Sequence, residues 1–364
     1  MIETEVETAT TSPTTTEQLA ELRAAWDALR QQQPTLRIRD AAHQLGVSEA
    51  ELLATGCGHT VQRLQADWGE FLPKVESLGE VMALTRNAHA VHEKIGTYHD
   101  VSVNGGVGLV VDRNIDLRLF FRQWKYGFAV SEDGKGAPRR SLQFFDSYGQ
   151  AVHKIYLRPD SNASAYDELV SQYRSQDQSG LIDVTPGSAT VADLPDEEID
   201  VAGLHAEWRA MEDTHQFYGM LRKYNVGRVQ ALRTAPPDLA HPMPVDTMHR
   251  ALVMASQENL GIMVFVNSPG VVQIHSGPVE RIVVTGDWVN VLDPGFNLHL
   301  RQPAIASAWV VRKPTVDGIV TSIEVFDEAG GTIAMMFGER KPGKPELEGW
   351  RAIVSQLEAE IAAA

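Results

Sequence analysis

The sequence predicts an α+β fold: a tandem duplication of an antiparallel-sheet module with flanking helices, preceded by an N-terminal helical segment. Three observations support this prediction. The chain changes from helical to β character near residue 79, its β regions repeat once at a fixed spacing, and 364 residues are many for one compact core.

The N-terminal part of the chain is expected to be helical after a short tail. Residues 1–16 are rich in Thr and have neither a basic start nor an apolar stretch, so they predict a disordered tail rather than a signal peptide. Residues 17–78 are expected to form helices, because apolar side chains from Leu19 to Leu29 recur at steps of three and four. Residues 35–54 resemble a helix-turn-helix, which leaves DNA binding open as a minor hypothesis.

The remainder of the chain is predicted to contain the two repeats. Short apolar runs separated by Gly, Asn and Asp turns predict strands from residue 79, and a helix is expected over 161–173. The first α+β repeat is therefore assigned to 79–173. A linker rich in Ser, Asp, Gln, Glu and Pro is assigned to 174–200, and the second repeat to 201–364.

The duplication is visible when the chain is compared with itself. A constant offset of 181 residues aligns the two β regions without a gap. The matched pairs are Leu117 with Leu298, Leu119 with Leu300, Phe145 with Phe326, Asp146 with Asp327, Gly149 with Gly330, Gly96 with Gly277 and Gly105 with Gly286. One offset that holds on both sides of several turns indicates two copies of one module. The space between such copies is a natural place for a ligand.

Composition excludes several classes of function. Lys and Arg number 32 against 48 acidic residues, a net charge of −16, which argues against broad binding to nucleic acids or anionic membranes. An anionic ligand would need a few concentrated cations. Cys57 is the only cysteine, which excludes intrachain disulfides and cysteine-based zinc or iron–sulfur sites and fits a reducing, cytoplasmic setting. No apolar run is long enough for a transmembrane helix.

His215 is the most informative candidate for chemistry. A helix is expected near residues 201–224, with one apolar stripe that contains Leu204, Trp208, Met211, His215 and Tyr218. A histidine on such a stripe is usually a satisfied core residue, and a general base in an unrelated enzyme is another alternative. However, aromatic neighbours and nearby cations fit a haem site. Imidazole ligates the iron, apolar walls cover the porphyrin, and Arg or Lys meets the propionates.

Eight segments provide an independent signal. In chain order they are GVSEAELLATGCGHTVQRL, VMALTRNAHAVHEKIGTY, IDLRLFFRQW, SLQFFD with AVHKIYL, EWRAMEDTHQFYGMLRK, DWVNV, WVVRKPT and FGER. Over roughly residues 20–355 the chain resembles the bacterial HemS-like, ChuS-like or PhuS-like haem-utilisation family. Its members are known as haemin-degrading factors or cytoplasmic haem-trafficking proteins. The resemblance also implies a duplicated α+β architecture.

The resemblance implies roles for individual residues. His215 is the implied proximal ligand of the haem iron. Arg118 is implied on the opposite side of the haem, where it would hydrogen-bond a water or hydroxide on the iron, because a guanidinium has no lone pair to give. Propionate or pocket contacts are implied for Arg228, Lys313 and Arg340. Two positions depart from the family pattern: Tyr218 stands where Phe is common, and Phe337 where Tyr is common.

The implied function is that of a cytoplasmic protein of haem uptake and iron acquisition. It would receive haem after an inner-membrane haem importer and pass it on, for example to a haem oxygenase. An enzyme that itself opens the porphyrin ring, using reductant and oxygen or peroxide, is the alternative. One haem per chain is expected, held between the two repeats, and neither nucleic acid nor insertion into a membrane is expected.

Overall fold

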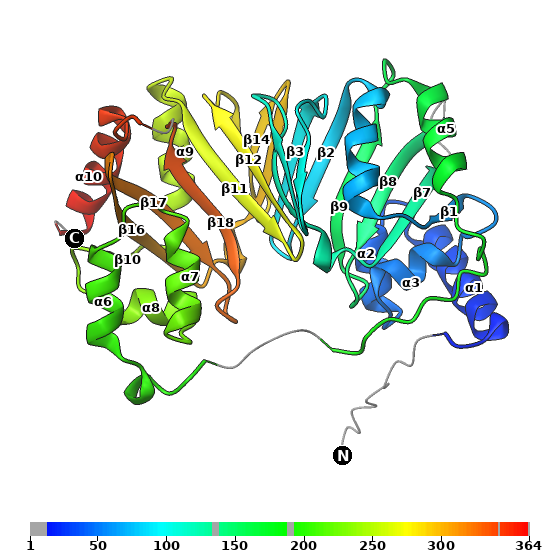
Figure 1. The fold of residues 1–364 in the computed structure, drawn as a ribbon, viewed down its shortest axis with the longest axis horizontal. Helices are drawn as coiled ribbons and strands as arrows, with labels where there is room; N and C mark the ends of the chain where they lie inside the picture. The colour runs from blue at the N-terminus through cyan, green and yellow to red at the C-terminus, as the bar shows by residue number, and fades with distance from the viewer. Residues whose placement is uncertain (1–12, 133–137, 188–192, 341–342, 363–364) are drawn as a thin grey trace.

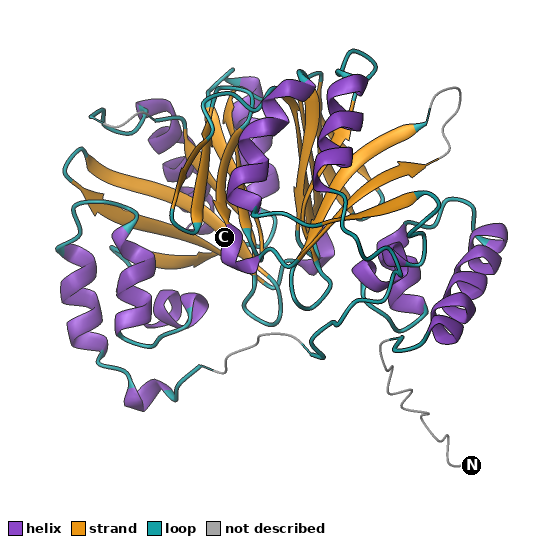
Figure 2. Cartoon of the chain, turned by 45° about the vertical axis from the view of Figure 1, so that its right-hand side comes forward, coloured by secondary structure: helices purple, strands orange, loops and turns teal. Residues whose placement is uncertain are grey.

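The computed structural model describes residues 13–132, 138–187, 193–340 and 343–362. Within these ranges two nine-stranded antiparallel sheets pack side by side, and helices flank them (Figures 1 and 2). Sheet A has the strand order β1-β7-β8-β9-β2-β3-β15-β14-β13, and sheet B has the order β10-β16-β17-β18-β11-β12-β6-β5-β4. The predicted α+β class with antiparallel sheets and flanking helices is confirmed.

The first half of the described chain contains helices, short 3₁₀ turns and nine strands. They are α1 (Thr16–Gln32), α2 (Ile38–Gln44), α3 (Glu49–Ala54), β1 (Val61–Leu64), α4 (Trp68–Phe71), η1 (Leu72–Leu78), β2 (Val81–Arg86), β3 (Ala90–Gly96), β4 (Ser102–Asn104), β5 (Val107–Val111), β6 (Asp116–Phe120), η2 (Phe121–Gln123), β7 (Tyr126–Glu132), β8 (Arg139–Phe145), β9 (Ala151–Leu157) and α5 (Ala163–Tyr173).

The second half of the described chain repeats this order. Its elements are η3 (Asp196–Glu198), α6 (Val201–Arg209), α7 (Gln216–Lys223), α8 (Arg228–Thr234), β10 (Ala240–Met243), α9 (Thr247–Gln257), β11 (Ile262–Ser268), β12 (Val271–Gly277), β13 (Ile282–Thr285), β14 (Trp288–Asp293), β15 (Phe296–Arg301), η4 (Gln302–Ala304), β16 (Ser307–Thr315), β17 (Gly318–Phe326), β18 (Thr332–Gly338) and α10 (Glu348–Ala362).

The duplication predicted from the sequence is confirmed by equivalent turns in the two copies. Oδ1 of Asp146 accepts the backbone N–H of Gln150 at 2.8 Å, and Oδ1 of Asp327 accepts that of Gly331, also at 2.8 Å. Each turn contains a glycine at positive φ, Gly149 or Gly330. The aspartate orders the turn through its side chain, and glycine adopts the left-handed conformation without a Cβ clash. The repeated sequence motif is therefore a repeated turn.

The two repeats exchange strands. β4, β5 and β6 follow β3 in the chain, but β6 pairs with β12 and joins sheet B, where Arg118 lies opposite Val272. In return β13, β14 and β15 join sheet A through β3, where Leu298 lies opposite His92. Each sheet therefore contains strands of both repeats. The intervals 79–173 and 201–364 are units of sequence that do not fold into separate sheets.

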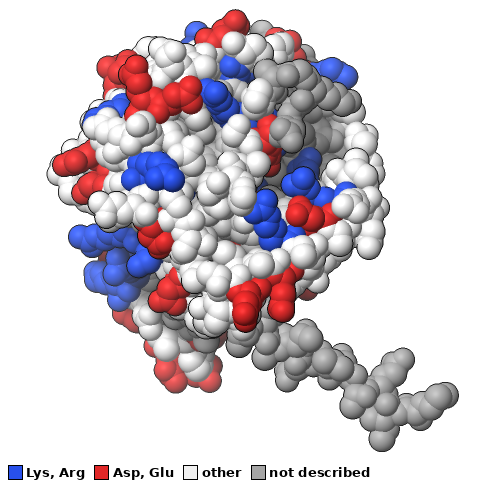
Figure 3. Space-filling view, turned by 90° about the vertical axis from the view of Figure 1, so that its right-hand side faces the viewer, with Lys and Arg blue, Asp and Glu red and all other residues white. Residues whose placement is uncertain are grey.

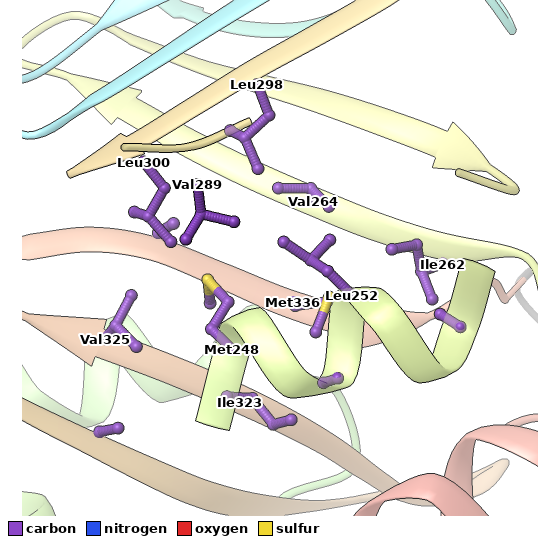
Figure 4. Packing of buried hydrophobic residues seen from close by; sticks show 14 of the residues in the cluster. Met248, Leu252, Ile262, Val264, Val289, Leu298, Leu300, Ile323, Val325 and Met336 are labelled. Atoms are coloured by element: carbon purple, nitrogen blue, oxygen red, sulfur yellow. The ribbon is translucent and has the colours of Figure 1, made fainter. Parts of the chain in front are cut away.

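Helices and sheets share two large apolar cores. In sheet B, Met248 and Leu252 of α9 pack against Val264, Ile323 and Met336 (Figure 4). The matching core of sheet A lies beneath α4, η1 and α5. The inner faces of the two sheets are in direct contact, since the side-chain amide of Gln273 donates to the carbonyl of Ala83 at 3.0 Å.

Three expectations about local structure need correction. The first twelve residues of the predicted tail lie outside the described residues, but the side chain of Thr15 caps α1, which begins at Thr16. The segment expected to be wholly helical contains strand β1, because pairing with β7 overrides its local pattern. The single helix expected near 201–224 is also wrong: α6 and α7 are separated at residues 210–215.

Replacing the two equivalent glycines with alanine should have unequal effects. At Gly330 a Cβ would come no closer than 3.6 Å to a neighbour, so Gly330→Ala should cost only the left-handed strain of about 1–2 kcal/mol. At Gly149 the Cβ would lie 2.2 Å from the hydroxyl oxygen of Ser48, which should add about 1–3 kcal/mol. Urea unfolding of both variants measures the difference. Equal losses would contradict the close contact.

Buried histidines should make stability depend on pH. His153 is enclosed by Tyr98 and Thr85, whose hydroxyl oxygens lie 2.6 and 2.9 Å from its ring nitrogens, and burial lowers its pKa to about 3. In the unfolded chain this histidine is therefore protonated below about pH 6.5, whereas in the folded chain it is protonated only below about pH 3. Stability should fall with acidification in that window, by about 1.4 kcal/mol per pH unit for each such histidine.

Unfolding free energies measured from pH 7 to pH 4 test this dependence. The slope should become shallower in His153→Gln, and His59→Gln, which changes an exposed histidine, is the control substitution. An unchanged slope in His153→Gln would mean that this ring does not oppose protonation.

Candidate functional site

One face of sheet B is covered by helices at one end only. Helices α6, α7 and α8 pack over β10, β16 and β17, with Trp208 and Phe217 in the same apolar cluster as Val311 and Phe326. The strand registers place a further set of side chains on this same face, along β18, β11, β12, β6 and β5. We call this set the open face: Leu109, Arg118, Met263, Phe265, Asn267, Val272, Met335 and Phe337.

The open face is apolar and accessible to solvent. All of its side chains are partly exposed except that of Phe337, which is 9% exposed and packs on Phe265 with ring centroids 5.0 Å apart. At its far edge Val107, Val111 and Phe120 are exposed as well. The opposite side of the same strands is buried in the core. A contiguous apolar surface of this kind indicates a binding site.

Arg118 is the positive charge on this face. Leu117 and Leu119 are completely buried on the other side of the strand, so Arg118 points away from the core. Its guanidinium is paired with Asp116, and burial raises the pKa of that carboxyl group despite the arginine. Arg118 comes from the first repeat, whereas its neighbours on β12, β11 and β18 come from the second.

His215 lies in the turn that precedes α7. Oδ1 of Asp213 accepts the backbone N–H of His215 at 2.8 Å and lies 2.6 Å from its Nδ1. These hydrogen bonds lower the pKa of Asp213. An ionised carboxylate can only accept, so Nδ1 carries the proton and Nε2 keeps its lone pair in the neutral ring. The His215 side chain is 88% exposed.

The break between α6 and α7 explains the exposure of His215. The side-chain oxygen of Gln216 accepts the backbone N–H groups of Glu212 and Asp213, so these groups bond within the turn instead of continuing α6. Trp208 and Met211 are buried before the break, whereas Tyr218 is 67% exposed after it. The single apolar stripe predicted from the sequence is therefore wrong. The turn itself is tied to the β16–β17 hairpin by a 3.0 Å hydrogen bond from Val316.

A buried charge triad connects α7, α8 and the open face. Glu324 is completely buried and accepts from Nε of Arg228 at 2.7 Å and from Nζ of Lys313 at 2.6 Å. Lys313 Nζ lies 4.8 Å from the ring centroid of Phe217 on α7 and 5.6 Å from that of Phe337. Two cations and one carboxylate give the triad a formal charge of +1, next to the apolar face.

The triad also shifts the pKa values of its members. Burial lowers the pKa of Lys313 to about 8. Burial also opposes ionisation of Glu324, but Arg228 and Lys313 outweigh it and hold the pKa of this carboxyl group well below its ordinary value. Glu324 was not predicted from the sequence, although a lone acid in the apolar strand TSIEVF is a signal of a buried partner.

The structure therefore brings the predicted residues together in two groups. Arg228 and Lys313 lie over the ring of Phe217, and Lys313 also lies over that of Phe337. Arg118 lies three strands away from Phe337, roughly 14 Å across the sheet at the usual strand spacing, and is displaced about four residues along the strands as well. Arg340 lies 3.6 Å from Asp317, with a side chain that is 17% exposed, and its charge helps to lower the pKa of Asp213. Arg340 thus belongs to the His215 side of the site.

The predicted position between the repeats takes a specific form. The inner faces of the sheets pack directly, whereas the open face combines strands of both repeats. A cavity of about 400 Å³ between η1 and α5 is lined by residues such as Lys74 and Gln172 and contains no predicted site residue. Across the described ranges, no cluster of three or more His, Cys, Asp or Glu side chains could hold a metal ion, and no helix is long and apolar enough to cross a membrane.

The helix-turn-helix alternative gains no support from charge. Helices α2 and α3 are joined by a tight turn at Gly46. Over the face of the molecule that Figure 3 presents, at the end that carries α1 and α5, basic and acidic side chains are interspersed. A surface that binds duplex DNA normally gathers positive charge.

Comparisons with known proteins identify close relatives. A family model described as the haemin-degrading HemS.ChuX domain matches residues 46–173 and 225–357. The hemin transport protein HmuS of Yersinia pestis is 41% identical over 320 residues, which cover 88% of this chain and 92% of HmuS.

Two solved structures extend the likeness to the whole fold. The structure of holo-PhuS, a heme-binding protein from Pseudomonas aeruginosa, is 45% identical with a TM-score of 0.90, covering 92% of this chain and 97% of PhuS. The Escherichia coli O157:H7 heme degrading enzyme ChuS is 36% identical with a TM-score of 0.86, covering 93% of this chain and 99% of ChuS.

Proposed function

The chain belongs to the haemin-degrading HemS.ChuX domain family, and on that premise we propose that it is a cytoplasmic haem-binding protein of haem uptake and iron acquisition. It holds one haem against the open face of sheet B, with His215 as the iron ligand, and passes the haem on. An inner-membrane haem importer and a haem oxygenase are the proposed partners upstream and downstream.

One observation supports the iron ligand above all others. The Nδ1 atom of His215 is fixed by Asp213, and the ring is 88% exposed. A carboxylate on the second nitrogen is the usual arrangement for metal-ligating histidines, since it sets the tautomer and raises the basicity of the ring. An exposed histidine prepared in this way, beside an apolar face, fits the iron of haem.

The open face suits the rest of the ligand. Met263, Phe265, Met335 and Phe337 can cover a porphyrin face, and Arg118 can donate a hydrogen bond to a water or hydroxide on the iron. Haem carries two propionates, and the triad next to the face has a formal charge of +1. An apolar surface over a small excess of positive charge favours an anionic, flat ligand.

The three cations proposed to interact with the propionates differ in how directly they can contact them. Lys313 is 3% exposed and committed to Glu324, so it acts through its charge beneath Phe337 rather than by direct contact. Arg228 is also bonded to Glu324, with its side chain 22% exposed. Arg340, paired with Asp317 only at 3.6 Å, is the best placed of the three for a direct propionate contact.

Degradation of haem is the second candidate. The relative ChuS is described as a heme degrading enzyme, so ring opening by this chain has to be tested directly. Loss of colour is weak evidence, because bound haem and a reductant can undergo coupled oxidation. Identifying the product in the presence and absence of catalase separates the two functions. A ring-opened product that persists with catalase would favour the enzyme, and unchanged haem would favour trafficking.

An absorption titration with haemin tests the proposed function. The expected result is a Soret band that saturates at one haem per chain, since His215 of the second repeat is the single proposed iron ligand. Saturation at two equivalent haems per chain would contradict the site, and the absence of saturable binding would overturn the function.

Arg118→Ala should weaken the site without removing the iron ligand. The arginine contributes a charge-assisted hydrogen bond, which is worth about 1.5–3 kcal/mol, so affinity should fall about ten- to a hundredfold. The ferric spectrum should still show histidine ligation. Arg122→Ala, which changes an exposed arginine four residues away, serves as the control. Loss of the histidine spectrum in Arg118→Ala would contradict the separation of the two roles.

A further inference from the structure

The first repeat has a face equivalent to the open face of sheet B. Helices α2 and α3 cover β1, β7 and β8 through the cluster that contains Leu53, Phe128 and Phe145, as α7 and α8 cover the corresponding strands of sheet B. The strands β9, β2, β3 and β15 extend this face of sheet A beyond the helices. Its side chains are related to those of the open face by the 181-residue offset.

The helices can be matched as well. Gly46 and Asn225 both have positive φ in the turns that precede α3 and α8, which sets the local offset at 179 residues. With this offset Glu49 corresponds to Arg228, and each residue begins its helix. Leu36 corresponds to His215. The first repeat therefore lacks the proposed iron ligand, and its face is not a copy of the haem site.

Three arginines distinguish the face of the first repeat. Arg39, Arg86 and Arg301 occupy the positions that correspond to Tyr218, Asn267 and Phe120 at the other site. Three positions that carry no charge around the open face of sheet B are therefore occupied by arginines at the equivalent face of sheet A. In a chain with a net charge of −16, such a concentration of guanidinium groups requires an explanation.

The three arginines meet at one place, the β2–β3 turn. Nη1 of Arg39 donates to the carbonyl of Ala88 at 3.0 Å. Arg86 is the last residue of β2, and the backbone N–H of Arg301 donates to the carbonyl of His89 at 2.9 Å. The three distant segments that carry these arginines therefore meet at the same turn.

These charges are incompletely neutralised. Arg86 is paired with Glu49, which also binds Lys154 and is therefore already shared between two cations. Within the ranges that the structure describes, no carboxylate oxygen lies within 4.0 Å of the side-chain nitrogens of Arg39 or Arg301. Burial lowers the pKa of Arg39 and repulsion from Arg86 and, less strongly, Arg301 adds to this effect, whereas the nearby carboxylates of Glu49 and Asp40 oppose it.

We propose that this face of the first repeat, formed by Arg39, Arg86 and Arg301 at the β2–β3 turn, binds a small molecule with two or more anionic oxygen groups. Phosphate and carboxylate groups both match the planar fork of a guanidinium, which binds them through two parallel hydrogen bonds. Arg39 has donors left over after its bonds to the turn, and Arg301 is exposed. The site is distinct from the open face of sheet B.

Calorimetric titration of the full-length, haem-free chain tests this site. The probes are inorganic pyrophosphate and, separately, citrate, at an ionic strength held constant with sodium chloride. Saturable binding of either probe supports the site and identifies phosphate or carboxylate as its preferred group. The absence of saturable binding for both probes overturns it.

Variants assign the binding to the cluster. Arg301→Gln and Arg39→Gln should each lower the affinity for the probe about tenfold or more, which is the contribution of one charge-assisted hydrogen bond. Arg281→Gln is the matched control, because it removes an exposed arginine of the β12–β13 connection that lies outside the cluster. Equal weakening in the control would show diffuse charge attraction and would overturn the site. Arg301 is exposed, so its substitution should leave folding intact.

Haemin titration of the same variants separates this site from the proposed function. Wild-type haem affinity in Arg301→Gln is expected, because the cluster and the open face lie on different sheets. Loss of haem binding together with loss of pyrophosphate binding would show that the anions compete at the haem site, which would contradict a separate site.

Discussion

His215→Ala should abolish histidine ligation and change the ferric spectrum of the haem complex. The histidine supplies the bond to the iron itself, whereas the residues around it contribute hydrogen bonds or apolar contact. Loss of an outer-shell partner of a metal-ligating histidine typically costs 10- to 100-fold in affinity, so loss of the ligand should cost more than about a hundredfold. Absorption titration with haemin measures both the spectrum and the affinity.

Asp213→Ala should lower haem affinity less than His215→Ala does. It leaves the imidazole in place but frees its Nδ1, which Asp213 holds at 2.6 Å. Affinity should fall about 10- to 100-fold while the histidine spectrum persists. His59→Ala, at an exposed histidine of the N-terminal segment, should bind haem like wild type. An unaltered Soret band in His215→Ala would remove the assignment and make His205 the next candidate.

Glu324→Gln should be the most destabilising conservative change near the site. The substitution keeps the shape of the side chain but leaves Lys313 and Arg228 without a counter-charge, and Lys313 is only 3% exposed. Breaking a buried ion pair from one side typically costs about 3–5 kcal/mol. Urea unfolding at pH 7 should show a loss of that size.

An exposed ion pair gives the matched control for Glu324. Asp196→Asn breaks the pair with Arg233, whose side chains are 42% and 57% exposed, and should destabilise the protein far less than Glu324→Gln. A comparable small loss in Glu324→Gln would contradict the burial of the triad. Haem binding by the folded fraction should persist in Glu324→Gln, because Arg228 stays charged beside the face even if Lys313, whose pKa Glu324 raises, loses its proton.

Much of the fold could be predicted because its signals are local. The duplication can be recognised from matched residues such as Asp146 and Asp327, each of which orders a turn through hydrogen bonds within five residues. The alternation of Arg118 with Leu117 and Leu119 correctly separates the two sides of a strand, because side chains alternate with a period of two. Such patterns need no knowledge of distant segments.

The candidate site could be predicted only in part. The resemblance to the family identified His215 and Arg118, but helical periodicity placed His215 on an apolar stripe, and the structure has it exposed beyond a helix break. At the break, the backbone N–H groups of Glu212 and Asp213 donate to the side-chain oxygen of Gln216, which competes with continuation of the helix. The side chains that make the open face apolar, such as Phe265 and Met335, were not singled out by any motif.

The sequence by itself determined the fold class, the duplication and the family, because each rests on a local pattern or on several motifs in order. Only the tertiary structure decided that the repeats exchange β4–β6 for β13–β15, since strand pairing across the molecule leaves no local signature. It also decided the partner of Arg228, because Glu324 is 96 residues away in the chain. A buried charge binds whatever opposite charge the fold brings within hydrogen-bond distance, and sequence spacing does not specify that neighbour.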